Sequence, residues 1–186
     1  SAMPLDVKEI TVMTTASIDL LSKGQRYVVR AMGELKNKGI IVKYHLVGGG
    51  KKEHLISEAE KAGVKDQLVF KGELTLDEVY QELDKIDIYI QPSLQEGLPR
   101  AVIEAMSRAC PCIGANTAGI PELLDDECIA KRHSGTDIAR ALEAMLAKGL
   151  ETYAIANFEH SKDYLESNLN ARRSNYFSIV KSKIGK

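Results

Sequence analysis

Tryptophan is absent from this 186-residue sequence, and cysteine and phenylalanine occur only three times each. An odd number of cysteines without regular spacing does not form the framework of a disulfide-bonded domain, and it favours a reduced, cytoplasmic setting. No apolar run in the sequence approaches the roughly 20 residues that a membrane-spanning helix needs. Within this sequence, these absences argue against a disulfide scaffold and against a bundle of apolar membrane helices.

A strong charge of either sign is also lacking. Lysine and arginine number 25 against 26 aspartates and glutamates, so the formal net charge is −1. That balance leaves no field to attract nucleic acid, and we expect no nucleic-acid partner. Apolar residues make up 44% and charged residues 27%, which is the composition of an ordinary globular domain with a sizeable core.

Metal ligands and catalytic triads are missing as well. None of the four histidines stands at a recognisable spacing from a serine or cysteine nucleophile, so structural or exposed roles are expected for them. Cys110 and Cys112 flank a proline and lack a second pair of ligands, which favours buried thiols over half of a metal site. We therefore expect no metal and no cofactor.

What the sequence does contain is a regular alternation of short apolar runs with longer amphipathic ones. The predicted strands are residues 8–13, 40–47, 67–71, 86–91, 112–115 and 127–130. The predicted helices are residues 23–38, 51–62, 98–109, 137–148, 151–165 and 168–184, with another that opens at Thr75 and has Glu78 in the capping-box position. Such alternation predicts the α/β class, as a doubly wound, Rossmann-like parallel sheet with helices on both faces.

The chain divides into three parts. Residues 1–3 (Ser-Ala-Met) are interpreted as an expression scar in front of the native sequence. Residues 4–150 are the predicted Rossmann-like domain, and residues 151–186 are a predicted helical tail. On this interpretation the sequence is a piece of a longer protein.

Two loops that follow strands carry candidate binding residues. Lys23 lies where the first helix is expected to begin, and its ammonium can reach a phosphate that also faces the positive end of that helix. Gly48, Gly49 and Gly50 follow the second strand, where glycines let backbone N–H groups approach a ligand. Neither loop matches a P-loop or G-x-G-x-x-G. A solvated lysine and a plain tight turn therefore remain alternatives.

A third loop carries two carboxylates. The stretch P-S-L-Q-E-G-L-P-R-A-V-I-E has Glu96 in its loop part and Glu104 two turns into the following helix. The N–H groups of Gly97 and Leu98 lie at the mouth of that helix, and Pro99 fits its first turn. Each carboxylate can accept two hydroxyl donors at once, as vicinal sugar hydroxyls offer. The alternative is one glutamate that interacts with the helix dipole and another that is merely on the surface.

These pieces, in this order, resemble the C-terminal half of the GT-B retaining glycosyltransferases of family 4, the group 1 glycosyltransferases. The resemblance runs from about Ile10 to Lys148. It rests on S-K-G-x5-R-A-M, H-L-V-G-G-G, V-F-K-G-E, D-I-Y-I-Q-P-S-L-Q-E-G-L-P-R-A-V-I-E-A-M and P-C-I-G-A-N-T-A-G-I-P-E-L-L. The E-x7-E element inside P-S-x-x-E-G-x-P is the most specific of these motifs.

The resemblance implies roles at a nucleotide-sugar donor site. Lys23 would contact the donor diphosphate and Glu96 would face the transferred sugar, so these two are the candidate catalytic residues. Glu104 would hold the ribose hydroxyls, and residues 70–73 would lie beside the base. The full set of residues expected to bind the donor is Lys23, Gly48, Gly72, Glu96, Gly97, Leu98, Pro99 and Glu104.

The sequence departs from the family pattern at two positions. The family usually has an arginine after the first strand that also grips the diphosphate, whereas this sequence reads M-T-T-A-S-I-D-L-L-S-K-G. Arg26, or the hydroxyls of Thr14, Thr15 and Ser17, are candidate replacements. Ala109 stands where the family has a glycine before a proline, and the change is expected to be small.

We therefore expect the donor-binding domain of a retaining enzyme that moves a hexose from a nucleotide diphosphate sugar to an acceptor hydroxyl without a metal. An N-terminal domain outside this sequence would bind the acceptor, and this piece alone is expected to transfer nothing. Polysaccharide biosynthesis is the expected setting, and peripheral membrane association of the whole protein stays open. Two alternatives also stay open: a nucleotide-sugar 2-epimerase of GT-B architecture, and a nucleotide-sugar-binding module without transfer activity.

Overall fold

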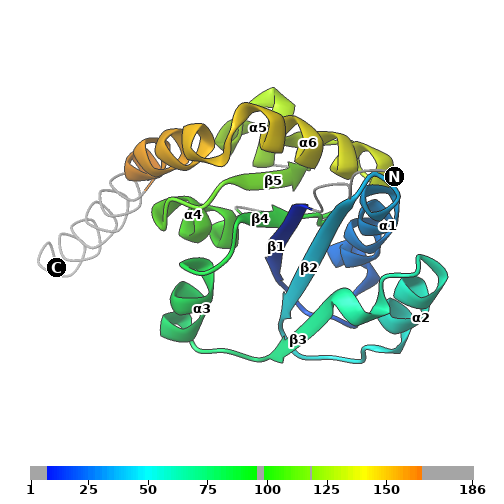
Figure 1. Cartoon of the computed structure of the whole chain (residues 1–186). Coiled ribbons are helices and arrows are strands. Elements are labelled where there is room, and N and C mark those ends of the chain that lie inside the picture. The colour runs from blue at the N-terminus through cyan, green and yellow to red at the C-terminus, as the bar shows by residue number, and fades with distance from the viewer. Residues whose placement is uncertain (1–7, 96–98, 118, 165–186) are drawn as a thin grey trace, which may run out of the picture.

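A computed structural model describes residues 8–95, 99–117 and 119–164 of the chain. In these residues, six parallel strands form one sheet in the order β3-β2-β1-β4-β5-β6 (Figure 1). The strands are β1 (Lys8–Thr15), β2 (Ile40–Val47), β3 (Leu68–Gly72), β4 (Ile88–Gln91), β5 (Cys112–Ala115) and β6 (Ile129–Ala130). The order reverses between β1 and β4, which is the topology of a doubly wound Rossmann-like sheet and confirms the predicted fold class.

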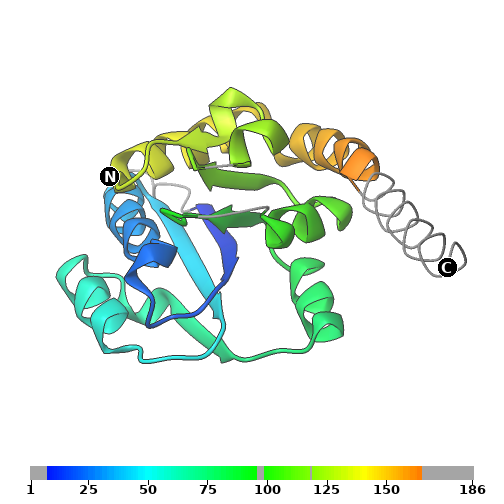
Figure 2. The ribbon, with the colours of Figure 1, turned by 180° about the vertical axis from the view of Figure 1, so that it is seen from behind.

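Helices cover both faces of the sheet. The helices are α1 (Gln25–Lys36), α2 (Glu53–Lys61), α3 (Leu76–Leu83), α4 (Arg100–Ser107), α5 (Ile120–Leu123), α6 (Gly135–Lys148) and a further helix over 150–164. Helix α1 packs against both α2 and α6 on one face, and α3 and α4 lie together on the other (Figures 1 and 2). No helix in the described part of the chain is long and apolar enough to cross a membrane.

The central strands of the sheet are buried on both faces. Val12, Met13, Ile88 and Ile90 are fully shielded from solvent, and such continuous apolar strands are typical of a parallel sheet between two helix layers. Strand β1 pairs with β2 over its whole length, from Lys8 opposite Ile40 to Thr15 opposite Val47. Burial therefore fixes the register that brings the ends of these two strands to the same edge.

Local signals set most helix ends. The side chain of Thr75 accepts the N–H of Glu78, and the Glu78 carboxylate accepts the N–H of Thr75, so the predicted capping box at the start of α3 is confirmed. The first helix begins at Gln25 rather than at Lys23, because Gly24 adopts a left-handed φ of 74° that ends a separate 3-10 turn at Leu21–Lys23. Lys23 therefore lies in that turn, one residue before the cap of α1.

The three cysteines are buried, which confirms the prediction for Cys110 and Cys112. Burial raises the pKa of the Cys110 and Cys128 thiols to about 12 and raises that of Cys112 well above its ordinary value. These thiols therefore stay protonated at neutral pH and act as small apolar side chains.

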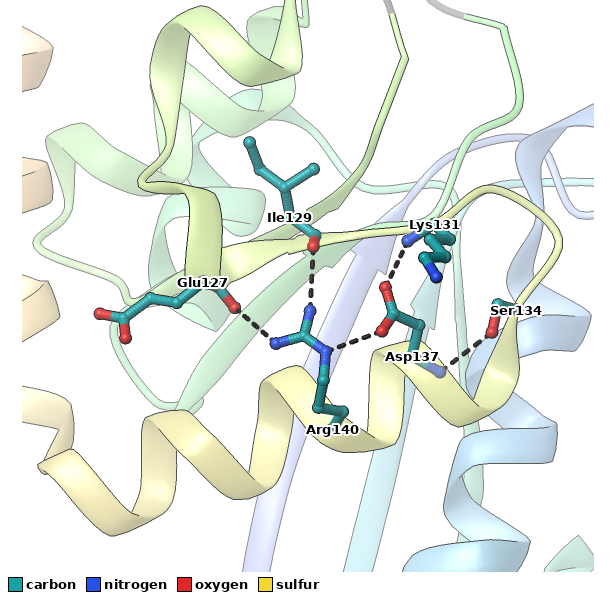
Figure 3. Close-up of polar contacts among 6 residues, drawn as sticks. All are labelled: Glu127, Ile129, Lys131, Ser134, Asp137 and Arg140. Carbon is teal, nitrogen blue, oxygen red and sulfur yellow. Dashed lines mark hydrogen bonds and ion pairs between the residues drawn. The ribbon is translucent and has the colours of Figure 1, made fainter.

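One corner of the fold is held by charged side chains. We call it the β6–α6 corner, and it consists of Glu127, Ile129, Lys131, Ser134, Asp137 and Arg140 (Figure 3). Arg140 Nε donates to Asp137 Oδ1 at 2.7 Å, and its Nη2 donates to the carbonyl of Ile129 at 3.1 Å. Asp137 Oδ2 accepts the backbone N–H of Lys131 at 2.6 Å. The Arg140 guanidinium accordingly holds the pKa of Asp137 below its ordinary value.

Candidate functional site

The loops that follow the strands meet at one edge of the sheet, which we call the C-terminal rim. In doubly wound sheets a ligand binds at this rim, near the point where the strand order reverses. Here that point lies between β1 and β4. The loop after β1 carries Lys23, and the loop after β4 leads toward Glu96. Glu96, Gly97 and Leu98 lie outside the described residues, so their predicted roles stay predictions.

Main-chain contacts hold these two loops together. The N–H of Leu94 donates to the carbonyl of Ser22 at 2.7 Å. Gly24 lies so close to the loop after β4 that a Cβ added to it would stand 2.1 Å from the carbonyl oxygen of Pro92. The turn that carries Lys23 is therefore fixed against the segment that leads to Glu96, as expected if both residues serve one site.

A buried chain of polar side chains supports the loop after β4. The hydroxyl of Tyr89 donates to Gln91 Oε1 at 2.7 Å, and Gln91 Nε2 donates to Ser93 Oγ at 2.8 Å. The hydroxyl of Thr117 donates to the carbonyl of Ser93, also at 2.8 Å. Because these groups are buried and satisfied, they restrict the loop to one conformation. In the sequence, the only indication of this hydrogen-bonded series was the presence of polar residues in an otherwise apolar strand.

The candidate replacements for the family arginine are now distinguished. Thr14 is buried in the sheet, where its hydroxyl donates to the carbonyl of Ile90 and accepts from Tyr44. The hydroxyl of Thr14 therefore cannot contact a diphosphate in place of the arginine. The hydroxyl of Ser17 donates to Asp19 at 2.6 Å. Arg26 Nη2 donates to the carbonyl of Leu21 at 3.3 Å.

Thr15 differs from the other candidates. Its hydroxyl is shielded from solvent and has no hydrogen-bond partner among the described residues. Buried polar atoms are nearly always paired, so an unpaired one at the end of β1 needs an explanation. A ligand bound at the rim would supply a partner.

Helix α4 carries the second predicted glutamate. Pro99 caps this helix, and Arg100 occupies its first turn. Glu104 is half-buried, and among the described residues its carboxylate has neither a hydrogen bond nor an ion pair. Burial raises the pKa of Glu104, although the positive charge of Arg100 opposes the shift. The sequence motif included Arg100, but nothing in the motif indicated that its charge acts on Glu104.

A pocket of about 610 Å³ opens at the rim beside β1, β2 and β3. We call it the Gly48 pocket, and its lining includes Thr15, Ser17, Asp19, Gly48, Gly50 and Glu73. Gly72, at the end of β3, accepts the N–H of Gly48 at 2.8 Å and so joins two of its walls. Lys23, Pro99 and Glu104 are not among the residues described as lining this pocket. The sequence predicted Gly48 and the region of residues 70–73, which includes Glu73, as part of the donor site, but it missed Asp19.

The histidines have the structural placements expected of them. His45 lies on β2 and His54 on α2, whereas His133 lies in a loop and His160 on the helix over 150–164. Within residues 8–95, 99–117 and 119–164, no group of three or more histidine, cysteine, aspartate or glutamate side chains could hold a metal ion.

Comparison with known sequences identifies the family. The family model described as "Glycosyl transferases group 1" matches residues 9–148. Protein CapJ of Staphylococcus aureus is 26% identical over 168 residues, which cover 85% of this chain and 42% of the relative. The putative colanic acid biosynthesis glycosyltransferase WcaL of Escherichia coli is 29% identical over 131 residues, covering 67% of this chain and 31% of the relative. The chain thus spans less than half the length of these relatives.

Solved structures confirm the fold. Sucrose-phosphate synthase from Thermosynechococcus elongatus aligns with a TM-score of 0.78 at 18% identity, over 94% of this chain and 47% of the other. Anabaena HepE in complex with UDP and glucose aligns with the same TM-score at 16% identity, over 92% of this chain and 48% of HepE. The C-terminal domain of the group 1 glycosyl transferase LpcC from Francisella tularensis aligns with a TM-score of 0.70 at 19% identity, over 84% of this chain and 85% of the LpcC domain. The chain belongs to the group 1 glycosyltransferases, and its fold is that of one half of a GT-B enzyme.

Proposed function

We propose that this chain is the donor-binding domain of a retaining glycosyltransferase, which moves a hexose from a nucleotide diphosphate sugar to an acceptor hydroxyl. In this proposal Lys23 and Glu96 act at the reacting groups, and Glu104 holds the ribose. The acceptor binds to a part of the protein outside this sequence. Several of the curated relatives are glycosyltransferases by name, which favours transfer over epimerisation or simple binding.

The observation that carries the proposal is the contact between the turn of Lys23 and the loop after β4. The Leu94 to Ser22 hydrogen bond and the close approach of Gly24 to Pro92 hold the lysine at the point where the strand order reverses. An ammonium group at that point can neutralise a departing diphosphate, together with the N–H groups at the start of α4. These groups supply the positive charge that a divalent ion supplies elsewhere, so the proposed transfer needs no metal.

The state of Glu104 supports its assignment to the ribose. A half-buried carboxylate with a raised pKa is unfavourable unless a donor satisfies it. The two ribose hydroxyls are donors that one carboxylate can accept together. HepE, whose fold is the same, was crystallised with UDP and glucose, which supports a nucleotide-sugar ligand for this fold.

The test measures diphosphate recognition separately from nucleotide binding. Isothermal titration calorimetry of the whole protein with matched nucleoside diphosphates and monophosphates gives an affinity ratio that isolates the second phosphate. We expect Lys23→Ala to lower that ratio by about tenfold, the size of one charge-assisted contact. The matched control is Lys43→Ala, which removes an exposed lysine paired with Glu9 on the far part of β1 and β2.

Two results would contradict the proposal. One is an unchanged diphosphate-to-monophosphate ratio in Lys23→Ala. The other is an equal fall in the Lys43→Ala control. A transfer assay with the donor that binds most tightly then decides between an enzyme and a binding module, because a binding module retains affinity and releases no transferred sugar.

A further inference from the structure

We propose that the Gly48 pocket holds the donor base and is built for guanine, so that the donor is a guanosine diphosphate sugar. This inference rests on the proposed function, since it assumes that a nucleotide sugar occupies the rim. HepE is only 16% identical to this chain, so the UDP in that structure shows that the fold accepts a nucleotide and says nothing of the base chosen here.

The pocket lies where a base would fall. Asp19, in its lining, is in the same loop as Lys23, and Glu73 directly follows the last residue of β3. A nucleotide whose diphosphate lies at Lys23 and whose ribose lies near α4 has room for its base over the ends of β1, β2 and β3. The volume of about 610 Å³ is within the range of small-molecule sites.

Several of the donors in the pocket wall are already engaged. The N–H of Ala16 donates to the carbonyl of Val47 at 2.9 Å, and the N–H of Gly48 donates to Gly72 at 2.8 Å. The hydroxyl of Ser17 donates to Asp19 at 2.6 Å. Uracil presents two carbonyl acceptors and needs hydrogen-bond donors opposite them. These three groups of the pocket wall could donate to uracil only by breaking the hydrogen bonds that they already make.

The acceptors, in contrast, are carboxylates that lie over the glycine loop. A Cβ added to Gly49 would stand 2.6 Å from Glu73 Oε1, and a Cβ added to Gly50 would stand 2.6 Å from Asp19 Oδ1. Glycine at both positions leaves room for the two carboxylates to lie against the loop. The hydroxyl of Ser17 lowers the pKa of Asp19, with smaller contributions from the charges of Lys51 and His54. Asp19 is therefore ionised at neutral pH and acts only as an acceptor.

Guanine matches such a wall better than the other bases. Its N1–H and its 2-amino group are adjacent donors on one edge, and a carboxylate accepts both in parallel. Adenine has one amino donor beside a ring acceptor, and a carboxylate would repel that acceptor. Because Asp19 Oδ1 already accepts from Ser17, we assign the paired contact to Glu73 and a supporting role to Asp19.

Thr15 provides an independent indication of a ligand in this pocket. Its hydroxyl lines the pocket, is shielded from solvent, and lacks a partner among the described residues. A hydroxyl can donate to an acceptor such as the O6 or N7 atom of a purine. A bound purine therefore satisfies a group that is otherwise buried without a hydrogen bond.

The test compares four nucleotides by calorimetry on the whole protein: GDP, IDP, UDP and ADP. IDP differs from GDP only in lacking the 2-amino group. We expect GDP to bind at least about tenfold more tightly than UDP or ADP, and about tenfold more tightly than IDP. Glu73→Gln should bring the GDP-to-IDP affinity ratio close to one, and Asp19→Asn should reduce it less. Glu60→Gln, an exposed glutamate paired with Lys65, is the matched control and should leave the ratio unchanged.

The outcomes separate this inference from the proposed function. Tighter binding of UDP or ADP than of GDP overturns the guanine assignment while supporting a nucleotide site at the rim. Binding of none of the four overturns the proposed function and this inference with it. An unchanged GDP-to-IDP ratio in a folded Glu73→Gln variant overturns the assignment of Glu73.

Discussion

The β6–α6 corner and the C-terminal rim of the sheet are held together by different means. At the corner, charged side chains bind one another and the main chain, and Arg140 alone contacts Asp137, Ile129 and Glu127 (Figure 3). At the rim, the loops after β1 and β4 are joined by a main-chain hydrogen bond and by the close approach of Gly24. The corner uses its charges for stability, whereas the rim is shaped by main chain and leaves Glu104 without a partner in the described structure.

One carboxylate from each region shows this difference in the direction of its pKa shift. Asp137 at the corner has a lowered pKa because of Arg140, and Glu104 at the rim has a raised pKa because of burial. A lowered pKa marks a carboxylate that contributes to folding, and a raised one marks a carboxylate whose ionised form is unfavourable in the folded protein. Perturbation by burial in a cleft is also a known mark of functional sites.

The most disruptive change is expected at Gly24. Gly24→Ala adds left-handed backbone strain and a clash with Pro92, and should cost about 2–4 kcal/mol of unfolding free energy. Donor binding should fall with it, because the turn of Lys23 would separate from the loop after β4. Gly63→Ala is the control, since Gly63 has a φ of 69° but nothing within 4 Å of its added Cβ. Urea unfolding of Gly63→Ala should show a loss of about 1–2 kcal/mol in the free energy of unfolding. Equal losses in both variants would mean that the contact with Pro92 does not hold the rim.

The corner is tested by Asp137→Asn. This change removes the Arg140 ion pair and weakens the hydrogen bond to Lys131, and should lower the free energy of unfolding by about 1–2 kcal/mol without affecting donor affinity. The pKa of Asp137 is lowered from 3.8, so its contribution is complete above that pH and is lost as the pH falls through the folded pKa. The stability difference between wild type and variant should therefore shrink below about pH 4. A difference that does not change with pH would exclude the ion pair as its source.

Glu104→Gln should give the reverse pattern. Donor affinity should fall by about tenfold, because the amide accepts fewer ribose hydrogen bonds, while stability near neutral pH stays equal or rises slightly. The pKa of Glu104 is raised above 4.5 in the folded protein. The stability of the wild type therefore falls as the pH rises from the unfolded-state pKa to the folded-state pKa. The variant should lack this fall, which chemical denaturation at a series of pH values can measure. Unchanged nucleotide affinity in a folded variant would remove Glu104 from the site.

The smallest effect is a gain at Ala109. This residue has a φ of 55°, in the left-handed region that favours glycine, and it follows the end of α4. The sequence alone indicated a small change from the family glycine, and the backbone now gives its sign. Ala109→Gly should raise the free energy of unfolding by about 0.5–1 kcal/mol with donor affinity unchanged. Loss of stability would show that the backbone there is not strained.

The sequence predicted the fold because periodicity and burial act locally. The bounds of β2 and β5 were predicted without error, as was the capping box of α3. The start of α1 was misplaced because Gly24 adopts a left-handed φ of 74° and ends a separate 3-10 turn, at a point where it packs against Pro92 from far along the chain. Burial of Thr14 in the sheet and the placement of Asp19 and Glu73 over the glycine loop are likewise tertiary effects. The roles of Glu96, Gly97 and Leu98 stay predictions, since these residues lie outside the described ones.

The three buried thiols make the opening of this fold directly measurable. Cys110, Cys112 and Cys128 lie on or beside β5 and β6, and burial keeps each of them protonated. Only the thiolate attacks a thiol-reactive reagent, so labelling requires that part of the sheet to separate from its covering helices. The labelling rate with and without bound nucleotide would therefore report how far a ligand at one edge stabilises strands at the other side of the sheet.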